Sequence, residues 1–179
     1  MAKNVLILSA SPRKGGNSDL LCDAFADGAR ASGNVVEKVR VADCEIGYCR
    51  ACSACERNGG RCAIADDMGR LLDRIVAADV LVLASPVYFY SIAAQLKTVI
   101  DRCVARWTEI RDKEFYYILS AAEDSDTVMD GALACMRGFL DCCDGSVEKG
   151  AICAKGVYGK GDAASTEYPA QAYQMGTIV

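Results

Sequence analysis

A continuous apolar run, Val80-Leu81-Val82-Leu83-Ala84, lies near the middle of the chain. A strand of this composition, without polar alternation, is typical of a parallel sheet whose two faces are both covered by helices. A similar run, Val5-Leu6-Ile7-Leu8, lies near the start of the chain. Because parallel strands need long crossover connections, which are usually helices, the two runs predict an α/β fold with a buried central sheet.

Stretches with helical apolar spacing alternate with five expected strands along the whole chain. The strands are expected at residues 3–10, 35–41, 80–84, 115–119 and 147–153. The helices are expected at residues 17–32, 66–76, 91–104 and 128–143, with a short last helix near Pro169. Asp66 and Asp67 are expected to cap the second helix. This alternation predicts one doubly wound parallel α/β domain over residues 1–179, with an irregular, cysteine-rich insertion at about residues 42–65.

The stretch from Ser9 to Ser18, Ser-Ala-Ser-Pro-Arg-Lys-Gly-Gly-Asn-Ser, joins the first strand to the first helix. The first backbone N–H groups of a helix have no internal acceptor and carry a partial positive charge, so a phosphate is stabilised there. The stretch lacks the Gly-Lys-Ser/Thr of a triphosphate loop and the Gly-x-Gly-x-x-Gly of a dinucleotide fold. It is therefore interpreted as a hydroxyl-rich phosphate site, or else as an ordinary turn and helix cap.

A second turn is expected directly after the central strand, at Ser85-Pro86-Val87-Tyr88-Phe89-Tyr90. In a doubly wound sheet, ligands bind beyond the carboxyl ends of the strands, where the turns after the first and third strands face each other. The three aromatic residues would then stand beside the phosphate site, which suits a planar ring with an apolar edge. The alternative is that these aromatic side chains belong to the core.

The chain has no histidine and eleven cysteines. Without histidine there is no Cys-His or Ser-His nucleophile pair and no mixed Cys/His zinc site, so the chemistry must come from a cofactor or from thiolates. An odd number of cysteines without a secretory signal favours reduced thiols in a cytoplasmic protein. The formal net charge of -4, without a basic run, argues against nucleic acid as a partner, and no apolar run approaches the length of a membrane span.

Four cysteines, Cys49, Cys52, Cys55 and Cys62, follow one another in the insertion as Cys-x2-Cys-x2-Cys-x6-Cys. Three cysteines separated by two residues are the spacing used to hold an iron-sulfur cube. A tetrahedral zinc site is a second interpretation of four cysteines. The third is a thiol-rich loop without metal, in which some cysteines are buried as small apolar side chains.

Two motifs resemble the NAD(P)H-dependent FMN reductase family of flavodoxin-like proteins, and the resemblance extends over nearly the whole chain. They are Ser9-Ala-Ser-Pro-Arg-x3-Asn-Ser, and Ser85-Pro-Val-Tyr-Phe-x-Ser with Gln95-Leu-Lys and Asp101-Arg102 downstream. The cysteine spacing, followed by Asp66-Asp67-Met68, is similar to the iron-sulfur flavoprotein branch of that family. The resemblance implies a flavodoxin-like three-layer sandwich with a five-stranded parallel sheet in the order 2-1-3-4-5.

The resemblance also implies which residues contact the cofactor FMN. The phosphate contacts fall on Ser9, Ser11, Arg13, Asn17 and Ser18, and the ring contacts on Pro86, Val87, Tyr88 and Phe89. The ligands of a 4Fe-4S cluster fall on Cys49, Cys52, Cys55 and Cys62. The third turn near the flavin, residues 120–124, departs from the family because it carries the carboxylates Glu123 and Asp124 instead of glycines or small polar residues. The glycine-rich loop 156–161 is similar to that of the family.

The sequence therefore predicts an FMN-dependent oxidoreductase that takes electrons from NAD(P)H and passes them, through a 4Fe-4S cluster if the cysteines hold one, to a small-molecule or protein acceptor. The flavin carries the chemistry, so no side chain is assigned as catalytic. Two alternatives are a non-catalytic, flavodoxin-type electron carrier and a zinc- or thiol-based redox-sensing module. The resemblance also implies a homodimer or higher homo-oligomer, for which Trp107 and the exposed side of the helix 91–104 offer an apolar patch.

Overall fold

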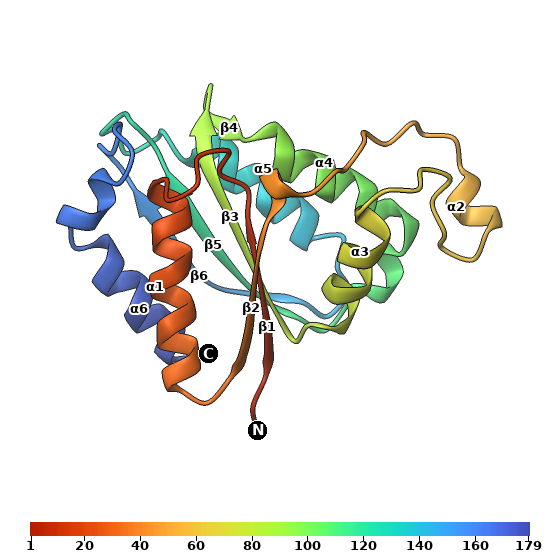
Figure 1. Cartoon of the computed structure of the whole chain (residues 1–179), viewed down its shortest axis with the longest axis horizontal. Coiled ribbons are helices and arrows are strands. Elements are labelled where there is room, and N and C mark those ends of the chain that lie inside the picture. The colour runs from red at the N-terminus through yellow and green to blue at the C-terminus, as the bar shows by residue number, and fades with distance from the viewer.

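Five parallel strands form the sheet at the centre of the computed structural model, which describes residues 1–179 (Figure 1). They are β1 (Asn4–Ser9), β2 (Val35–Arg40), β3 (Val80–Tyr88), β5 (Glu114–Ser120) and β6 (Val147–Ala154). Their order across the sheet is β2-β1-β3-β5-β6, which is 2-1-3-4-5 when the parallel strands are numbered along the chain. The predicted flavodoxin-like sheet is confirmed, and so is the central place of the strand that begins at Val80.

Side chains of β1 and β3 alternate between two hydrophobic cores, one on each face of the sheet. Leu6 and Leu8 pair in register with Leu81 and Leu83, and all four belong to the larger core of 26 buried residues. Ile7, between the two leucines of β1, belongs to the second core of 17 buried residues. Because neither face of these strands meets water, the sequence shows continuous apolar runs there instead of alternation.

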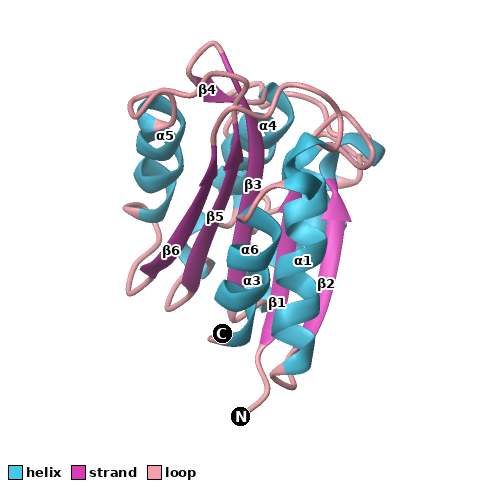
Figure 2. Cartoon of the chain, turned by 90° about the vertical axis from the view of Figure 1, so that its left-hand side faces the viewer, coloured by secondary structure: helices cyan, strands magenta, loops and turns pink.

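Helices cover both faces of the sheet (Figure 1, Figure 2). On one face lie α1 (Asn17–Ala31) and α6 (Tyr168–Thr177), and on the other lie α3 (Met68–Ala77), α4 (Ala94–Arg102) and α5 (Asp130–Leu140). None of these helices is long and apolar enough to cross a membrane. Each crossover returns the chain to the start of a new parallel strand, so the turns that follow the strands gather at one edge of the sheet.

Helices α1 and α6 touch through two glycines. A Cβ atom at Gly28 would lie 2.0 Å from the carbonyl oxygen of Tyr173, and one at Gly176 would lie 2.2 Å from the carbonyl oxygen of Phe25. These distances are far below van der Waals contact, so any side chain at either position would push the helices apart. The backbone of α1 is therefore held directly against the backbone of α6.

The turn expected at residues 85–90 is shorter than predicted. Strand β3 continues to Tyr88, and Ser91–Ile92 forms a short strand, β4, that pairs antiparallel with its end, so α4 begins later than expected. Ser85 stabilises this arrangement, because its Oγ accepts the backbone N–H of Ala93 at 2.8 Å at the base of the hairpin. The pattern of apolar residues in the sequence does not reveal a single side-chain hydrogen bond of this kind.

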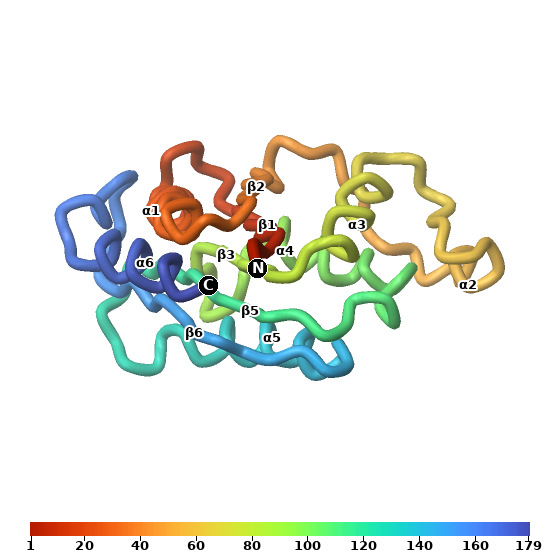
Figure 3. Tube along the Cα trace, turned by 90° about the horizontal axis from the view of Figure 1, so that it is seen from below, coloured from red at the N-terminus to blue at the C-terminus, as the bar shows by residue number.

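The cysteine-rich insertion forms little regular structure. A 3-10 turn at Val41–Asp43 leads into it, and α2 (Ala54–Arg57) is its one helix. Figure 1 and Figure 3, viewed from perpendicular directions, both place α2 at the far end of the molecule, away from the sheet. The other 3-10 turns are Cys103–Ala105 and Trp107–Glu109, which follow α4, and Asp162–Ser165, which precedes α6.

Candidate functional site

A cavity of about 180 Å³ lies at the carboxyl ends of the parallel strands, and its walls come from the turns after β1, β3, β5 and β6. The lining residues are Ser11, Arg13, Gly16, Asn17, Pro86, Val87, Tyr88, Ser120, Ala122, Val157 and Tyr158. The structure thus brings six of the nine residues expected to contact FMN to one cavity. Of the other three, Ser9 and Ser18 are buried outside its lining, and Phe89 is fully exposed.

The first turn of α1 offers free hydrogen-bond donors at this cavity. Gly16 occupies the N-cap position, and no side chain caps the helix. The first backbone N–H groups of a helix have no acceptor within it, and here none is supplied by a cap. The Oγ atom of Ser18 is also buried without any hydrogen-bond partner. A buried polar atom without a partner is rare in a folded protein, and its presence at a helix start indicates an anion site.

Asp19 stabilises the turn between β1 and α1 through hydrogen bonds and ion pairs, a role that was not predicted from the sequence. Its carboxylate accepts the hydroxyl of Ser9 at 2.7 Å and the backbone N–H of Gly15 at 2.8 Å. Lys38 and Arg40 of the edge strand β2 form ion pairs with it at 3.2 Å and 3.0 Å. Burial raises the pKa of this carboxyl, but the hydrogen bonds from Ser9, Gly15 and Lys38 outweigh burial and hold the pKa below its ordinary value. The hydroxyl of Ser9 is thus engaged within the protein.

Asn17 fastens the glycine-rich loop to the start of α1. Its Nδ2 donates to the carbonyl oxygens of Val157 and Gly159 at 3.1 Å and 2.9 Å, and its Oδ1 accepts the N–H of Ala163 at 3.1 Å. Arg13 reaches the same loop, donating to the carbonyl of Tyr158 at 3.4 Å. The amide group of Asn17 therefore shapes one wall of the cavity.

The hairpin between β3 and β4 ends in an unfavourable backbone conformation. Phe89 and Tyr90 form its two-residue loop, and their φ angles of 48° and 60° lie in the left-handed region. Both central residues of a type I′ turn adopt such angles, which is why Asn-Gly is the preferred sequence and bulky residues are outliers there. The hydroxyl of Tyr90 donates to the carboxylate of Glu123 at 2.8 Å. This bond gives a structural role to one of the two unexpected carboxylates of the third turn.

Replacing Phe89 by asparagine is expected to raise the free energy of unfolding by about 1 kcal/mol, because asparagine tolerates the left-handed conformation. In the single chain the side chain of Phe89 is fully exposed, so no packing within the chain is lost. The comparison is made at a protein concentration at which the chain is monomeric. Urea denaturation measures the change. Tyr158→Asn is the matched control, because Tyr158 is another exposed aromatic residue but has no positive φ. A gain of the same size in the control would show that strain at Phe89 is not the cause.

A second cavity, of about 360 Å³, lies in the insertion and is lined by all four cysteines of the motif, Cys49, Cys52, Cys55 and Cys62. No three Cys, Asp or Glu side chains in the molecule are grouped closely enough to hold a single metal ion. Ala51 and Ser53, which stand between the first three cysteines, have φ angles of 49° and 50°. Residues with a Cβ atom adopt this conformation at an energetic cost, and such outliers concentrate where a ligand is held.

The remaining seven cysteines are free thiols away from this cavity. Cys22 and Cys103 are buried in the two cores, and burial raises the pKa of both thiols. Burial also raises the pKa of Cys143 to about 11. These three thiols stay protonated at neutral pH and act as small core residues.

The neck of the insertion is closed by hydrogen bonds between its two ends. The backbone N–H of Gly47 donates to Asp66 at 2.9 Å, and the N–H of Glu45 donates to Asp67 at 2.9 Å. Arg102, at the end of α4, donates to both oxygens of Asp66 at 2.7 Å and 2.9 Å, and to the carbonyl of Gly47 at 2.6 Å. The two aspartates precede α3 as predicted, and Asp66 accepts the N–H of Met68, the first residue of this helix, at 3.1 Å, whereas Asp67 forms no side-chain cap bond.

Burial raises the pKa of Asp66, but hydrogen bonds from Arg102, Gly47 and Met68 outweigh burial and hold the pKa below its ordinary value. The carboxylate is therefore charged at neutral pH. A depressed pKa means that the neck gains stability from this group above the ordinary carboxyl pKa and loses it as the pH falls through the lowered value.

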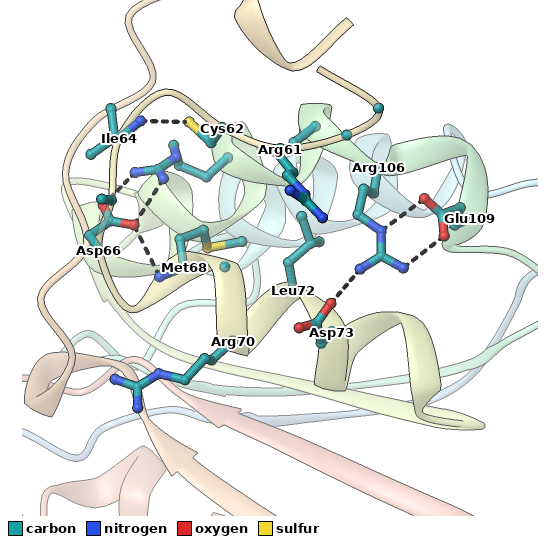
Figure 4. Close-up of a pocket in the computed structure, with 16 residues that line it drawn as sticks. Arg61, Cys62, Ile64, Asp66, Met68, Arg70, Leu72, Asp73, Arg106 and Glu109 are labelled. Atoms are coloured by element: carbon teal, nitrogen blue, oxygen red, sulfur yellow. Dashed lines mark hydrogen bonds and ion pairs between the residues drawn. The ribbon is translucent and has the colours of Figure 1, made fainter. Parts of the chain in front are cut away.

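A larger cavity of about 670 Å³ lies on the other side of Cys62, between the insertion and α3 (Figure 4). At one end of it Arg106 pairs with Asp73 and Glu109, whereas Asp66 lies with Cys62 at the other end. The residues that line both this cavity and the cysteine cavity, and so form the wall between them, are Cys62, Ile64, Arg102 and Ala105.

Comparison of the sequence with known proteins identifies related proteins. A model of the family described as NADPH-dependent FMN reductase matches residues 3–132. An iron-sulfur flavoprotein of Archaeoglobus fulgidus is 42% identical over 92 residues, which is 51% of this chain and 41% of the relative. One from Methanosarcina thermophila is 38% identical over 97 residues, which is 54% of this chain and 50% of the relative. The matched segments thus span about half the length of these relatives or less.

Solved structures share the fold over nearly the whole chain. An NAD(P)H:quinone oxidoreductase from Methanothermobacter marburgensis superimposes with a TM-score of 0.78 at 18% identity, covering 99% of this chain and 96% of the other. An FMN-dependent NADH-azoreductase from Bacillus anthracis, in complex with FMN, gives 0.71 at 16% identity and covers 98% and 96%. At such identities the likeness concerns the fold. Because the family model matches well over half of the chain, the chain belongs to the NADPH-dependent FMN reductase family.

Proposed function

We propose that this chain binds FMN at the carboxyl ends of its strands and uses it to oxidise NAD(P)H. The observation that carries the proposal is the 180 Å³ cavity, where the uncapped start of α1 meets Pro86, Val87 and Tyr88. One side of this cavity offers donors for a phosphate, and the other offers a strand end with an aromatic residue for a planar ring. Membership of the FMN reductase family supports the same ligand.

The residues present fit the phosphate of FMN. The backbone N–H groups at the start of α1, the hydroxyl of Ser11 and the guanidinium of Arg13 would hold it. The unpartnered hydroxyl of Ser18 belongs to the same helical turn, although it is buried outside the cavity lining, and would be a further donor. The negative charge of Asp19 does not oppose the phosphate, because Lys38 and Arg40 pair with it. Ser9 and Asn17 serve the site indirectly, since Ser9 donates to Asp19 and Asn17 holds the wall.

When bound, FMN supplies the electron-transfer chemistry, and the chain supplies its binding, orientation and electrostatic surroundings. Pro86, Val87 and Tyr88 would lie along the ring, and Phe89 would stand at its edge on the hairpin tip. The bond between Tyr90 and Glu123 keeps that tip in place. NAD(P)H as the electron donor is supported by the family description and by a putative NAD(P)H-dependent FMN-containing oxidoreductase of Bacillus subtilis, 26% identical over 62% of this chain.

We propose further that Cys49, Cys52, Cys55 and Cys62 hold a 4Fe-4S cluster that passes electrons to a small-molecule or protein acceptor. Four thiols that line one cavity, with residues in unfavourable φ between them, fit a ligand held by all four cysteines. A tetrahedral zinc ion is the competing interpretation of the same four ligands. The matched relatives named iron-sulfur flavoprotein support the cluster.

The FMN site is tested by replacing Ser18 with alanine. FMN titration is expected to show about tenfold weaker binding, because a charge-assisted hydrogen bond to the phosphate is lost. Without FMN, the same variant is expected to be as stable as the wild type or slightly more stable, because the removed hydroxyl had no partner. Ser165→Ala, on an exposed serine outside the cavity, is the control. Unchanged FMN affinity in Ser18→Ala would contradict the assigned phosphate site.

An enzyme is distinguished from a non-catalytic electron carrier by a turnover assay. The FMN-loaded protein is mixed with NADPH or NADH and an excess of a quinone acceptor, and the oxidation of the nicotinamide is followed over time. Continuous turnover is expected. Reduction of one equivalent by dithionite, without nicotinamide turnover, would identify an electron carrier instead.

The cluster is tested by measuring iron and acid-labile sulfide after anaerobic purification. Zinc without sulfide would contradict the cluster.

We also propose that a second copy of the chain completes the FMN site. Ligand pockets usually measure about 300–1,000 Å³, so a cavity of 180 Å³ is too small to enclose the whole cofactor. Exposed aromatic side chains surround it at Phe89, Tyr90 and Tyr158. Sedimentation velocity is expected to show a dimer that Phe89→Glu dissociates and Trp107→Glu does not. The opposite result would place the interface at the exposed Trp107 and Val104 instead.

A further inference from the structure

Arg102 is the one buried charge beside the cysteine cavity. The other charged residues that line this cavity, Arg50, Glu56 and Asp101, are exposed to solvent. The side chain of Arg102 is 1% exposed. Water and salt screen exposed charges strongly, whereas a buried charge acts on its neighbours through a medium of lower dielectric constant. The electrostatic potential in the cavity therefore depends on Arg102 more than on the other three residues.

The guanidinium of Arg102 is held in place by hydrogen bonds, but one of its N–H donors has no acceptor. Its two Nη atoms donate to the carboxylate of Asp66 and to the carbonyl of Gly47, which closes the neck. Its Nε–H is buried and has no partner. A structural role in the neck accounts for the Nη bonds but leaves this donor unexplained, although an unsatisfied buried donor destabilises a folded protein.

Arg102 also stands in the wall that includes Cys62. It lines the cysteine cavity and the larger cavity on the other side of Cys62. The ion pair with Asp66 holds the guanidinium in this position. A fixed cation with a spare N–H thus lies in the same cavity wall as Cys62.

We propose that Arg102 sets the reduction potential of the group bound by the four cysteines, by holding a fixed positive charge and a free N–H at the cavity wall. The proposal rests on the proposed cluster. A 4Fe-4S cluster ligated by four thiolates takes up one electron and no proton when it is reduced, so its net charge becomes more negative by one. A neighbouring cation stabilises the reduced form more than the oxidised form and raises the potential. Arg102 is not a ligand, and it acts as a positioning residue.

The test compares three variants purified anaerobically with their cluster and FMN. Arg102→Gln removes the charge but keeps an N–H donor, and Asp66→Asn removes the partner's charge while an amide oxygen can still accept from Arg102. Arg106→Gln removes an arginine that lines the larger cavity and not the cysteine cavity. A dithionite titration, followed by the electron paramagnetic resonance of the reduced cluster, gives the midpoint potential. The flavin absorbance in the same titration gives an internal reference.

We expect the equilibrium constant for reducing the cluster to fall about tenfold in Arg102→Gln, which is a shift of about 59 mV to lower potential for a one-electron couple. In Asp66→Asn the potential is expected to rise, because the charge of Arg102 is then no longer neutralised. Arg106→Gln and the FMN potential are expected to stay as in the wild type. Opposite shifts in the two variants cannot arise from a loosened neck, because both substitutions weaken the same ion pair.

The outcomes separate this proposal from the one on which it rests. A wild-type protein that binds FMN but contains no iron or sulfide would overturn the cluster and this proposal together. A wild-type cluster whose potential is unchanged in both variants, or shifts in the same direction in both, would overturn the role of Arg102 alone. If Arg102→Gln folds without a cluster, Asp66→Asn decides the question, since a potential that does not rise overturns the proposal.

Discussion

Replacing Asp66 by alanine is expected to lower the free energy of unfolding by about 3 kcal/mol, which is a large part of the total for a single domain. The variant leaves the buried guanidinium of Arg102 without its counter-charge and removes the acceptor for the N–H of Gly47. A buried charge that has lost its partner destabilises a protein more than the intact pair stabilises it. Urea denaturation, monitored by circular dichroism, measures the loss.

Asp67→Ala is the matched control for this prediction. Asp67 also accepts a backbone N–H across the neck, from Glu45, and also pairs with an arginine, Arg70. The side chain of Arg70, however, is 81% exposed, so its charge remains solvated when the partner is lost. A much smaller loss is therefore expected, and equal losses in the two variants would contradict the assignment of the buried pair as the main closure of the neck.

Replacing Asn17 by alanine is expected to weaken FMN binding about a hundredfold and to lower the free energy of unfolding by about 2 kcal/mol. The variant releases Val157 and Gly159 from α1 and leaves the N–H of Ala163 without an acceptor. Because these residues form or support one wall of the cavity, FMN loses contacts when the loop is no longer held against α1. FMN titration and urea denaturation measure the two effects.

Asn34→Ala provides the control for Asn17→Ala. Asn34 also joins distant parts of the chain, accepting the N–H of Lys3 and donating to the carbonyl of Val179, but it lies outside the FMN cavity. This variant is expected to lose stability and to keep its FMN affinity. If FMN affinity in Asn17→Ala is no weaker than in Asn34→Ala, the loop does not contribute to the binding site.

The sheet could be predicted from the sequence because its information is local. The apolar runs near Leu6 and Leu81 are continuous, and each is followed by a helical stripe, so the parallel sheet and the edge where ligands bind follow from general rules of α/β folds. The strand order was implied by the family resemblance. The hairpin at Phe89 was not foreseen, because the antiparallel pairing of Tyr88 with Ser91 and the bond between Ser85 and Ala93 leave no pattern in the sequence. Its left-handed residues are not those that a turn of this kind normally uses.

The site could be predicted only in outline. The motifs predicted six of the eleven residues that line the cavity, but they did not predict that Ser9 donates to Asp19 or that Asn17 holds the glycine-rich loop. Those partners come from other parts of the chain, and polar side chains at a turn do not reveal which acceptor they will meet. Arg102 lies on a helix, and the residues next to it in the sequence do not predict that its side chain is buried. Only the fold brings it against Asp66 and Cys62.

The glycine contact between α1 and α6 fixes how far the start of α1 extends along the strands. A helix that packs through ordinary side chains can slide along its axis by small rotamer adjustments, but Gly28 forms a notch into which the carbonyl of Tyr173 fits. Axial movement of α1 in either direction would drive the Cβ atoms of neighbouring residues into that carbonyl. The donors at the start of α1 therefore keep a set level relative to the strand ends, and this level is imposed from the last helix of the fold.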